Sequence, residues 1–345
     1  MQRRSHLLAL GLGGSLMALP AAAQDLTVVS WGGSYQDAQR QVYFEPFAAE
    51  TGTRIVEDTW DGGIGVIRAR VEGGDAGWDV VQVETEELLI GCEEGLLQPI
   101  DWERIGPEDE FIPGAVHECG VGTIVWSTVL TYDAERLDEA PTRWADFFDL
   151  EAFPGKRGLR KGPKFALEFA LIADGVPPEE VYEVLRTEDG VERAFAKLET
   201  IKPEVIWWEA GAQPPQLLAA GEVAMTSVYN GRLTAPRQEG RDFRIVWDGS
   251  IYAIDYWVIL EGSDRTDEAY EFIQFASQPE RQKDLPQTID YGVTHVGAAE
   301  VIDPEILPWL PTAPDNLAVA IEIDEGFWVE NIDRLNERFN RWVAR

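Results

Sequence analysis

The sequence predicts an α/β protein of two lobes, each a mostly parallel sheet flanked by helices, and three observations support this fold class. Short runs rich in β-branched residues alternate with helical stretches over the first hundred residues after the leader. A loop-rich passage and a second alternation of helices and strands follow, and the first pattern returns near residue 256. A strand–helix–strand series implies right-handed crossovers and a parallel sheet covered on both faces.

The leader itself occupies residues 1–23 and has the three parts of a cleaved secretory signal. These are a basic head, an apolar run of about 13 residues and an exit of three alanines. The apolar run is too short to span the roughly 30 Å of a bilayer's hydrocarbon core. We therefore expect a protein that is exported, cleaved and soluble in the periplasm. The paired Arg3 and Arg4 leave the general and the twin-arginine export routes both open.

The first lobe begins directly after the leader. Its predicted strands are residues 26–30, 54–58 and 79–83, and its predicted helices are residues 36–50 and 64–72, with a third helix starting near Thr85. Ser34 and Asp37 have the spacing of a capping box at the start of the first helix.

The middle of the chain predicts the second lobe. Helices are predicted at residues 165–173, 178–185, 191–200 and 215–220, and strands at residues 205–207, 223–228 and 243–247. A strand at residues 256–260 and a helix at residues 267–278 then return to the first lobe. In residues 330–345 apolar side chains recur at helical spacing, which predicts a tail helix packed on the core.

Composition restricts the partners and the redox state. Asp and Glu number 62 against 29 Lys and Arg, a formal net charge of −33. Such a surface repels nucleic acid and anionic lipid and attracts cationic solutes. Two cysteines in an oxidising compartment, Cys92 and Cys119, predict one disulfide that closes a loop of some 27 residues.

Candidate binding residues gather where the predicted strands end, which is where parallel sheets bind ligands. They are Trp31, Trp60 and Glu84 early in the chain and Glu209, Tyr229, Arg232 and Asp255 later. Of the two tryptophans, Trp31 is the favoured ligand contact. Aromatic faces beside carboxylates predict a pocket for an organic cation, because both attract positive charge.

Enzyme motifs are missing from the sequence. It has no Gly-x-Ser-x-Gly elbow, no phosphate loop, no His-Glu-x-x-His and no Cys-x-x-Cys. Only His117 and His295 remain after export, so we expect no metal site and no cofactor. Acid pairs such as Glu84 and Glu86 keep a secreted hydrolase as a disfavoured alternative.

Several motifs in a fixed order point to a known family. They are LTVVSWGGSY, FEPFAAETG, WDVVQVE, TIVWSTVLTYD, APTRWADFFDL, EVAMTSVYNGR, IYAIDYWVI and IDYG. In these motifs the chain resembles the periplasmic solute-binding proteins of bacterial ABC importers, specifically the spermidine/putrescine-binding group. The resemblance implies a monomer of the type II periplasmic-binding-protein fold, whose hinged cleft holds a polyamine and whose partner is a membrane permease.

The resemblance also implies where the lobes divide. The first lobe should comprise residues 24–131 and 254–301, and the second residues 132–253 and 302–345. The chain should cross between them near residues 129–133, 250–255 and 301–304.

Individual binding roles follow from the same resemblance. Trp31, Tyr35, Tyr229 and Tyr291 match the aromatic residues that enclose a polyamine, and Asp255 matches the central amine-binding carboxylate. Burying an ammonium group without a partner is costly, so we expect Asp255 to be the most important of them.

Two departures from the polyamine pattern favour a different ligand. Where polyamine binders carry acids, this chain has a basic cluster over residues 160–164, and Ala253 replaces an aromatic residue. The basic cluster would oppose the second ammonium of a diamine and suit a carboxylate, and Arg232 could bind a carboxylate through two hydrogen bonds. An ω-amino acid therefore stays an alternative to the polyamine, and a sensor subunit stays an alternative to a transport component.

Overall fold

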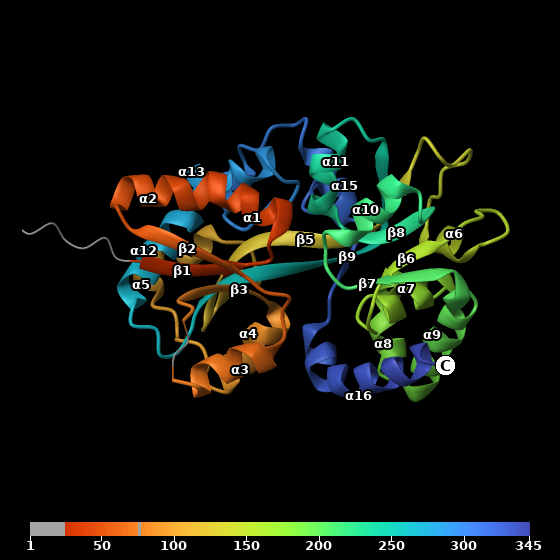
Figure 1. Ribbon diagram of the computed structural model, residues 1–345, viewed down its shortest axis with the longest axis horizontal. Helices are drawn as coiled ribbons and strands as arrows, with labels where there is room; N and C mark the ends of the chain where they lie inside the picture. Colours follow the sequence, from red (N-terminus) through yellow and green to blue (C-terminus); the bar gives the residue numbers. More distant parts are fainter. Residues whose placement is uncertain (1–24, 75–76) are drawn as a thin grey trace, which may run out of the picture.

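The computed structural model describes residues 25–74 and 77–345, so the signal predicted over residues 1–23 lies outside the described part of the chain. The main sheet has the strand order β2-β1-β3-β9-β5-β8-β6-β7, with helices on both faces (Figure 1). The strands are β1 (Asp25–Ser30), β2 (Arg54–Thr59), β3 (Val80–Glu84), β4 (Val116–His117), β5 (Gly120–Asp133), β6 (Arg157–Arg160), β7 (Val205–Trp208), β8 (Met225–Tyr229), β9 (Phe243–Ile259), β10 (Gly292–Val293) and β11 (Ile321–Glu322).

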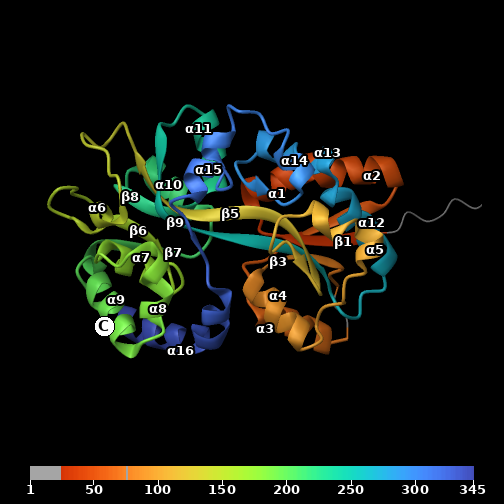
Figure 2. The same ribbon diagram turned by 180° about the vertical axis from the view of Figure 1, so that it is seen from behind.

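Two long strands cross the molecule and divide this sheet. β5 and β9 pair antiparallel, from Val121 opposite Trp257 to Asp133 opposite Phe243. We call the half with the parallel strands β2, β1 and β3 the first lobe, and the half with the parallel strands β8, β6 and β7 the second lobe. Figure 2 shows β5 and β9 running from one lobe into the other.

Each lobe carries its own helices (Figures 1 and 2). Those around the first lobe are α1 (Gly33–Gln39), α2 (Glu45–Thr51), α3 (Ile64–Glu72), α4 (Thr85–Glu93), α5 (Trp102–Ile105), α12 (Thr266–Ser277), α13 (Pro279–Gln282) and α14 (Val296–Ala299). Those around the second are α6 (Trp144–Phe148), α7 (Ala166–Ala173), α8 (Val181–Leu185), α9 (Glu188–Glu199), α10 (Gln213–Ala220), α11 (Thr234–Gln238), α15 (Pro314–Leu317) and α16 (Glu325–Val343). The residue boundaries predicted for the two lobes stay a prediction.

The first helical stretch differs from the prediction in its start and its centre. Helical structure runs over residues 33–51, with a π-helical segment at Arg40–Phe44 between α1 and α2. The predicted capping box of Ser34 and Asp37 is wrong, because the helix begins one residue earlier, at Gly33. The N–H of Gly32 instead donates to the side chain of Gln36 at 3.2 Å.

Two strands differ from the prediction for identifiable reasons. The runs predicted at residues 243–247 and 256–260 are parts of the single strand β9, because β5 pairs with both of them and also with residues 251–255, on the two sides of a register shift that leaves residues 247–250 without a partner in β5. β6 was not predicted, because its first residue, Arg157, is charged. The Arg157 side chain is fully buried and donates to the carbonyls of Phe147 and Phe153, both at 2.6 Å.

The core of the second lobe explains the tail helix. α7 is apolar along most of its length, and Phe169 stacks on Trp144 with ring centroids 3.6 Å apart. α16 buries one face, including Trp328, Leu335 and Phe339. The tail aromatics therefore pack on the core as predicted.

The predicted disulfide is present. Cys92 at the end of α4 is bonded to Cys119, which directly precedes β5, and their Cα atoms lie 5.7 Å apart. Among the described residues, no helix has the length and apolar character needed to cross a membrane.

Candidate functional site

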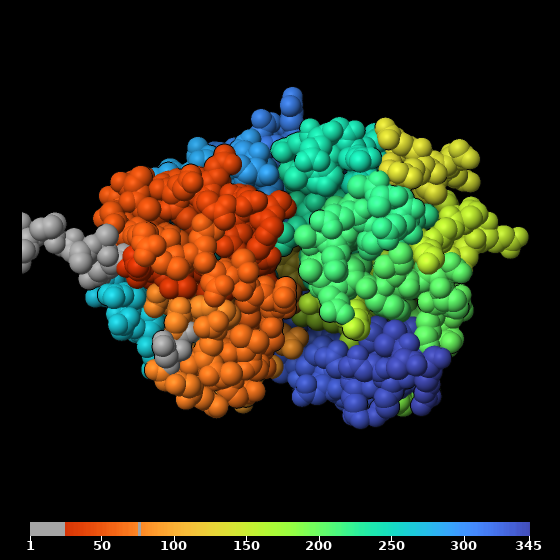
Figure 3. All heavy atoms as spheres, in the orientation of Figure 1, coloured from red at the N-terminus to blue at the C-terminus, as the bar shows by residue number. Residues whose placement is uncertain are grey.

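A cavity lies between the two lobes, with an empty volume of about 590 Å³ counting the space open to solvent. Figure 3 shows the hollow between the red and orange first lobe and the green second lobe. The turns that follow β1, β2 and β3 line it from one side, and the ends of β6, β7 and β8 line it from the other. All eight predicted ligand contacts line this cavity, namely Trp31, Tyr35, Glu84, Glu209, Tyr229, Arg232, Asp255 and Tyr291.

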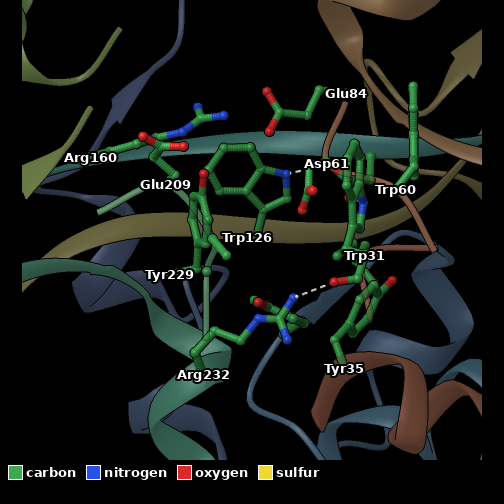
Figure 4. Close-up of a pocket in the computed structure, with 15 residues that line it drawn as sticks. Trp31, Tyr35, Trp60, Asp61, Glu84, Trp126, Arg160, Glu209, Tyr229 and Arg232 are labelled. Atoms are coloured by element: carbon green, nitrogen blue, oxygen red, sulfur yellow. Dashed lines mark hydrogen bonds between the residues drawn. The ribbon is translucent and has the colours of Figure 1, made fainter. Parts of the chain in front are cut away.

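The first-lobe wall is a pair of stacked indoles. Trp31 and Trp60 lie with ring centroids 5.1 Å apart and planes inclined by 16°. The indole N–H of Trp60 donates to the carbonyl of Gln82 at 3.0 Å, which fixes the outer ring. A fixed outer ring holds Trp31 with one face toward the cavity (Figure 4).

Further aromatic rings enclose the rest of the cavity. Trp126, from β5, meets Tyr229 edge to face at 5.1 Å. Tyr35 meets Tyr291 in the same way at 5.2 Å, and both tyrosines are almost fully buried. Edge-to-face contacts of this kind stabilise ring orientation, so the cavity is preformed by packing among its own residues.

Asp255 lies at the base of the cavity with 3% of its surface exposed. One carboxylate oxygen accepts a hydrogen bond from the indole N–H of Trp126. The other oxygen accepts one from the indole N–H of Trp31 at 2.7 Å and one from the side-chain amide of Gln82 at 3.1 Å. Burial, and then repulsion by Glu84, raise the pKa of Asp255 well above its ordinary value. Because its described hydrogen-bond partners are all neutral, this carboxylate would gain from a positive charge nearby.

Three basic residues of the predicted cluster have three different environments. Lys161 is exposed and pairs with Glu209 at 2.6 Å. Lys164 is buried and contacts Glu84 at 3.2 Å, together with two other glutamates. Arg160 lines the cavity, and within the part of the chain that the structure describes its side chain makes no hydrogen bond or ion pair.

The surroundings of Arg160 favour its charged form. Burial acts to lower the pKa of Arg160, but its electrostatic interactions with Tyr229, Glu84, Glu87 and Glu86 outweigh burial and raise the pKa above its ordinary value. A charged guanidinium in a partly dry cavity is a binding group for an anion.

Arg232 joins the two lobes. One terminal nitrogen donates to the backbone carbonyl of Gly32 at 2.9 Å. The other donates to that of Trp31 at 3.2 Å (Figure 4). Gly33 permits this approach, because its φ is +59° and a Cβ there would lie 2.9 Å from the guanidinium. The predicted two-bond contact of Arg232 with a ligand carboxylate would have to replace these bonds.

The sequence gives little or no signal for some of the other residues that line the cavity. Trp126 lies in the middle of β5, where no strand-end signal marks it, and Arg160 was noted only as one member of the basic cluster. Trp60 and Asp61 also line the cavity, and the glycines after them had marked their turn as a candidate.

The described residues hold no group of His, Cys, Asp and Glu side chains that could bind a metal ion. The binding groups of the cavity are instead aromatic faces, carboxylates and, among the described residues, the guanidinium of Arg160, which has no ion pair. This set suits a small organic molecule that carries both a positive and a negative charge.

Comparison with known proteins supports a binding role. A family model described as bacterial extracellular solute-binding protein matches residues 43–307. A gamma-aminobutyric acid-binding protein of Pseudomonas aeruginosa is 49% identical over 328 residues, which cover 95% of this chain and 93% of that protein. A spermidine/putrescine-binding periplasmic protein of Salmonella typhimurium is 24% identical over 301 residues, which cover 84% of this chain and 82% of that protein.

Solved structures agree. A periplasmic binding protein of Agrobacterium tumefaciens B6, in complex with glucopine, has a TM-score of 0.86 at 32% identity and covers 93% of this chain and 100% of its own. A structure described as a GABA receptor has a TM-score of 0.82 at 35% identity and covers 93% of this chain and 98% of its own. These matches confirm the predicted two-lobe fold, and the polyamine-binding relative is the more distant one.

Proposed function

The chain belongs to the bacterial extracellular solute-binding proteins, and from this premise we propose that it captures an ω-amino acid of the γ-aminobutyrate type in the cavity between its lobes. Membership of this non-enzymatic family confirms that the chain is not an enzyme. In this proposal the protein is a periplasmic monomer and delivers its ligand to a membrane ABC permease.

The observation that carries the proposal is the unpaired guanidinium of Arg160. A charged group in a partly dry cavity is stabilised by a partner of opposite charge, and a carboxylate can accept two parallel hydrogen bonds from a guanidinium. The ligand carboxylate would bind here, at the second-lobe side of the cavity, where Arg160 projects beside Tyr229 (Figure 4).

The amine end of the ligand has a separate set of partners. The face of Trp31 and the buried carboxylate of Asp255 lie together, joined by the indole hydrogen bond. A cation over an aromatic face gains roughly 0.5–2 kcal/mol. The ammonium group would therefore bind on the first-lobe side, with its positive charge facing Asp255.

A diamine fits this arrangement less well. Its second ammonium would approach Arg160, and two like charges 4 Å apart repel by roughly 4 kcal/mol at an effective dielectric constant of about 20. The relatives support the same choice, because the γ-aminobutyrate-binding relative shares 49% identity and the polyamine-binding relative 24%. The polyamine, which the motifs first favoured, remains a second candidate because Glu84, Asp61 and Asp255 also line the cavity.

Calorimetric titration of the mature protein tests the proposal with two ligands of matched length, γ-aminobutyrate and putrescine. We expect γ-aminobutyrate to bind and putrescine to bind more weakly. Arg160→Gln should weaken γ-aminobutyrate binding by roughly 30-fold or more, or about 2 kcal/mol, because a charge-assisted contact is lost.

The control for this titration is Arg143→Gln, since Arg143 is exposed and pairs locally with Asp146 outside the cavity. It should bind as the wild type does. A wild-type protein that binds putrescine but not γ-aminobutyrate would contradict the proposal and return the ligand to the polyamines.

A further inference from the structure

Lys164 occupies the centre of a buried acidic cluster beside the binding cavity. Its ammonium nitrogen lies 3.2 Å from Glu84, 3.7 Å from Glu86 and 3.5 Å from Glu325. The lysine side chain is 7% exposed and those of the three glutamates 10–20%. Glu84 and Glu86 lie at the junction of β3 and α4 in the first lobe, whereas Lys164 precedes α7 and Glu325 begins α16 in the second lobe (Figure 1). The contacts of Lys164 with Glu84 and Glu86 therefore join the two lobes.

The backbone next to Lys164 adopts an unusual conformation. Phe165 has φ 71° and is the only non-glycine residue with positive φ in the described part of the chain. Such a conformation costs on the order of 1–3 kcal/mol and persists only where the surroundings hold it. Phe165 is buried against Trp126, a cavity wall, so this turn couples the cavity to the position of Lys164.

Glu84 connects this cluster to the binding cavity. It lines the cavity together with Arg160, yet its hydrogen bond goes to Lys164 and no ion pair joins it to Arg160 among the described residues. Burial acts to raise the pKa of Glu84, but Lys164 and then Arg160 lower it below its ordinary value, so Glu84 is ionised. An ionised glutamate beside an unpaired arginine would pair with it unless another cation held it.

We propose that Lys164 is a positioning residue that sets the ligand's charge class: it holds Glu84, and thereby leaves the guanidinium of Arg160 free to bind a ligand carboxylate. This inference rests on the proposed function. Without Lys164, Glu84 turns to Arg160 and neutralises it. The cavity then loses its anion-binding group, and its remaining carboxylates, with Asp255 at its base, favour a ligand with ammonium groups only.

The test compares the dissociation constants of γ-aminobutyrate and putrescine in the wild type and in Lys164→Gln. In Lys164→Gln we expect the binding of γ-aminobutyrate to be at least tenfold weaker than in the wild type, while putrescine binds equally well or more tightly. The ratio of the two constants therefore shifts by at least tenfold. Lys197→Gln is the matched control, because Lys197 lies on α9 and pairs with Asp174 away from the cavity, and it should leave the ratio unchanged.

A second variant separates positioning from a structural role. In Lys164→Gln/Glu84→Gln the carboxylate of Glu84 is gone and cannot neutralise Arg160, so γ-aminobutyrate binding should recover to within about threefold of the wild type. A purely structural defect would not be rescued by a second substitution in the same cluster. Lys164→Arg, which keeps a cation beside Glu84, should also keep the wild-type ratio.

The outcomes are distinguishable. A wild type that prefers putrescine overturns the proposed function itself. If the wild type prefers γ-aminobutyrate, two results overturn only the role of Lys164. One is that Lys164→Gln weakens the binding of both ligands equally, and the other is that the double variant does not recover γ-aminobutyrate binding. If Lys164→Gln does not fold, the inference is tested with the double variant and Lys164→Arg instead. A ratio of the two dissociation constants that differs more than tenfold from the wild-type ratio in either variant overturns the inference.

Discussion

The carboxylate of Asp255 orients two aromatic rings of the cavity at once. Its oxygens accept the indole N–H groups of Trp31 and Trp126, one from each side. The sequence predicted an amine-binding role for this residue, and the structure adds this support of the two rings. Loss of the carboxylate would therefore disturb both the charge and the shape of the cavity.

A second buried carboxylate, Glu168 on α7, links stability to pH. One oxygen accepts the Trp328 N–H at 2.8 Å and the Tyr182 hydroxyl at 3.1 Å, and the other has no described partner. Burial raises the pKa of Glu168 from 4.5 to about 7. Because the folded state holds this proton more tightly than the unfolded state, the stabilisation is present below pH 4.5 and is lost as pH rises to about 7.

Glu168→Gln should remove that dependence, because the amide oxygen still accepts both hydrogen bonds and carries no charge. We expect the variant to be more stable than the wild type by roughly 3 kcal/mol at pH 8 and nearly equal to it at pH 4.5. Thermal melts across this range measure the difference, with exposed Glu222→Gln as the control. A wild type as stable at pH 8 as the variant would contradict the burial of an ionised carboxylate.

At the level of single residues, the sequence predicted best those cavity residues whose place in the chain, at the end of a strand or just after it, brings them to the cleft. Trp31, Glu84 and Tyr229 end strands or follow them, and strand ends meet at the cleft. Trp126 could not be found this way, because it lies in the middle of a strand whose every residue is buried. The three environments of Arg160, Lys161 and Lys164 depend on side-chain packing, which no local pattern encodes.

At the level of elements, the disulfide joins α4 to the start of β5. It closes a loop of 27 residues, for which chain-entropy arguments give a stabilisation of about 3 kcal/mol. The double variant Cys92→Ser/Cys119→Ser should melt several degrees below the wild type in calorimetry. Reducing agent should lower the wild-type melting temperature to a similar extent and leave that of the variant unchanged.

Ligand binding should survive this change, because neither cysteine lines the cavity between the lobes. Equal dissociation constants in the oxidised wild type and the double variant are therefore expected. A variant with unaltered melting temperature would show that the bridge adds nothing to stability.

The elements that the sequence predicted well are those in which the local pattern of apolar and polar residues matches the burial of the element. α3, at Ile64–Glu72, has the predicted bounds, and β1, β2 and β7 agree within one residue at each end. The errors lie where strand pairing or the hydrogen bonds of a buried charge override the local pattern. β9 is one strand because β5 pairs with it on both sides of a register shift near its polar centre, and β6 begins with a buried arginine that donates to the carbonyls of Phe147 and Phe153, ten and four residues earlier in the chain.

At the level of the whole molecule, Arg232 holds the lobes together through backbone atoms. Its hydrogen bonds to the carbonyls of Trp31 and Gly32 do not depend on the ligand's chemistry. Arg232→Ala should therefore weaken the binding of γ-aminobutyrate and the binding of putrescine by a similar factor, roughly 30-fold, because hydrogen bonds from a charged donor contribute about 2 kcal/mol.

The same titrations measure this effect, and small-angle scattering of the ligand-bound variant should show a more open average shape. Selective loss of γ-aminobutyrate alone would instead give Arg232 the carboxylate contact that the sequence suggested. Comparison with Arg160→Gln separates closure of the lobes from recognition of the ligand.

The central position of β9 in the sheet sets the order in which a nascent chain can fold. β3 pairs with β9, from Val80 opposite Ile259, so a ribosome must make residue 259 of the 345 before the first three parallel strands meet their fourth neighbour. Contacts so distant in sequence form late, and the earlier segments wait without their partner. The sheet of the first lobe is thus incomplete until about three quarters of the chain has been made.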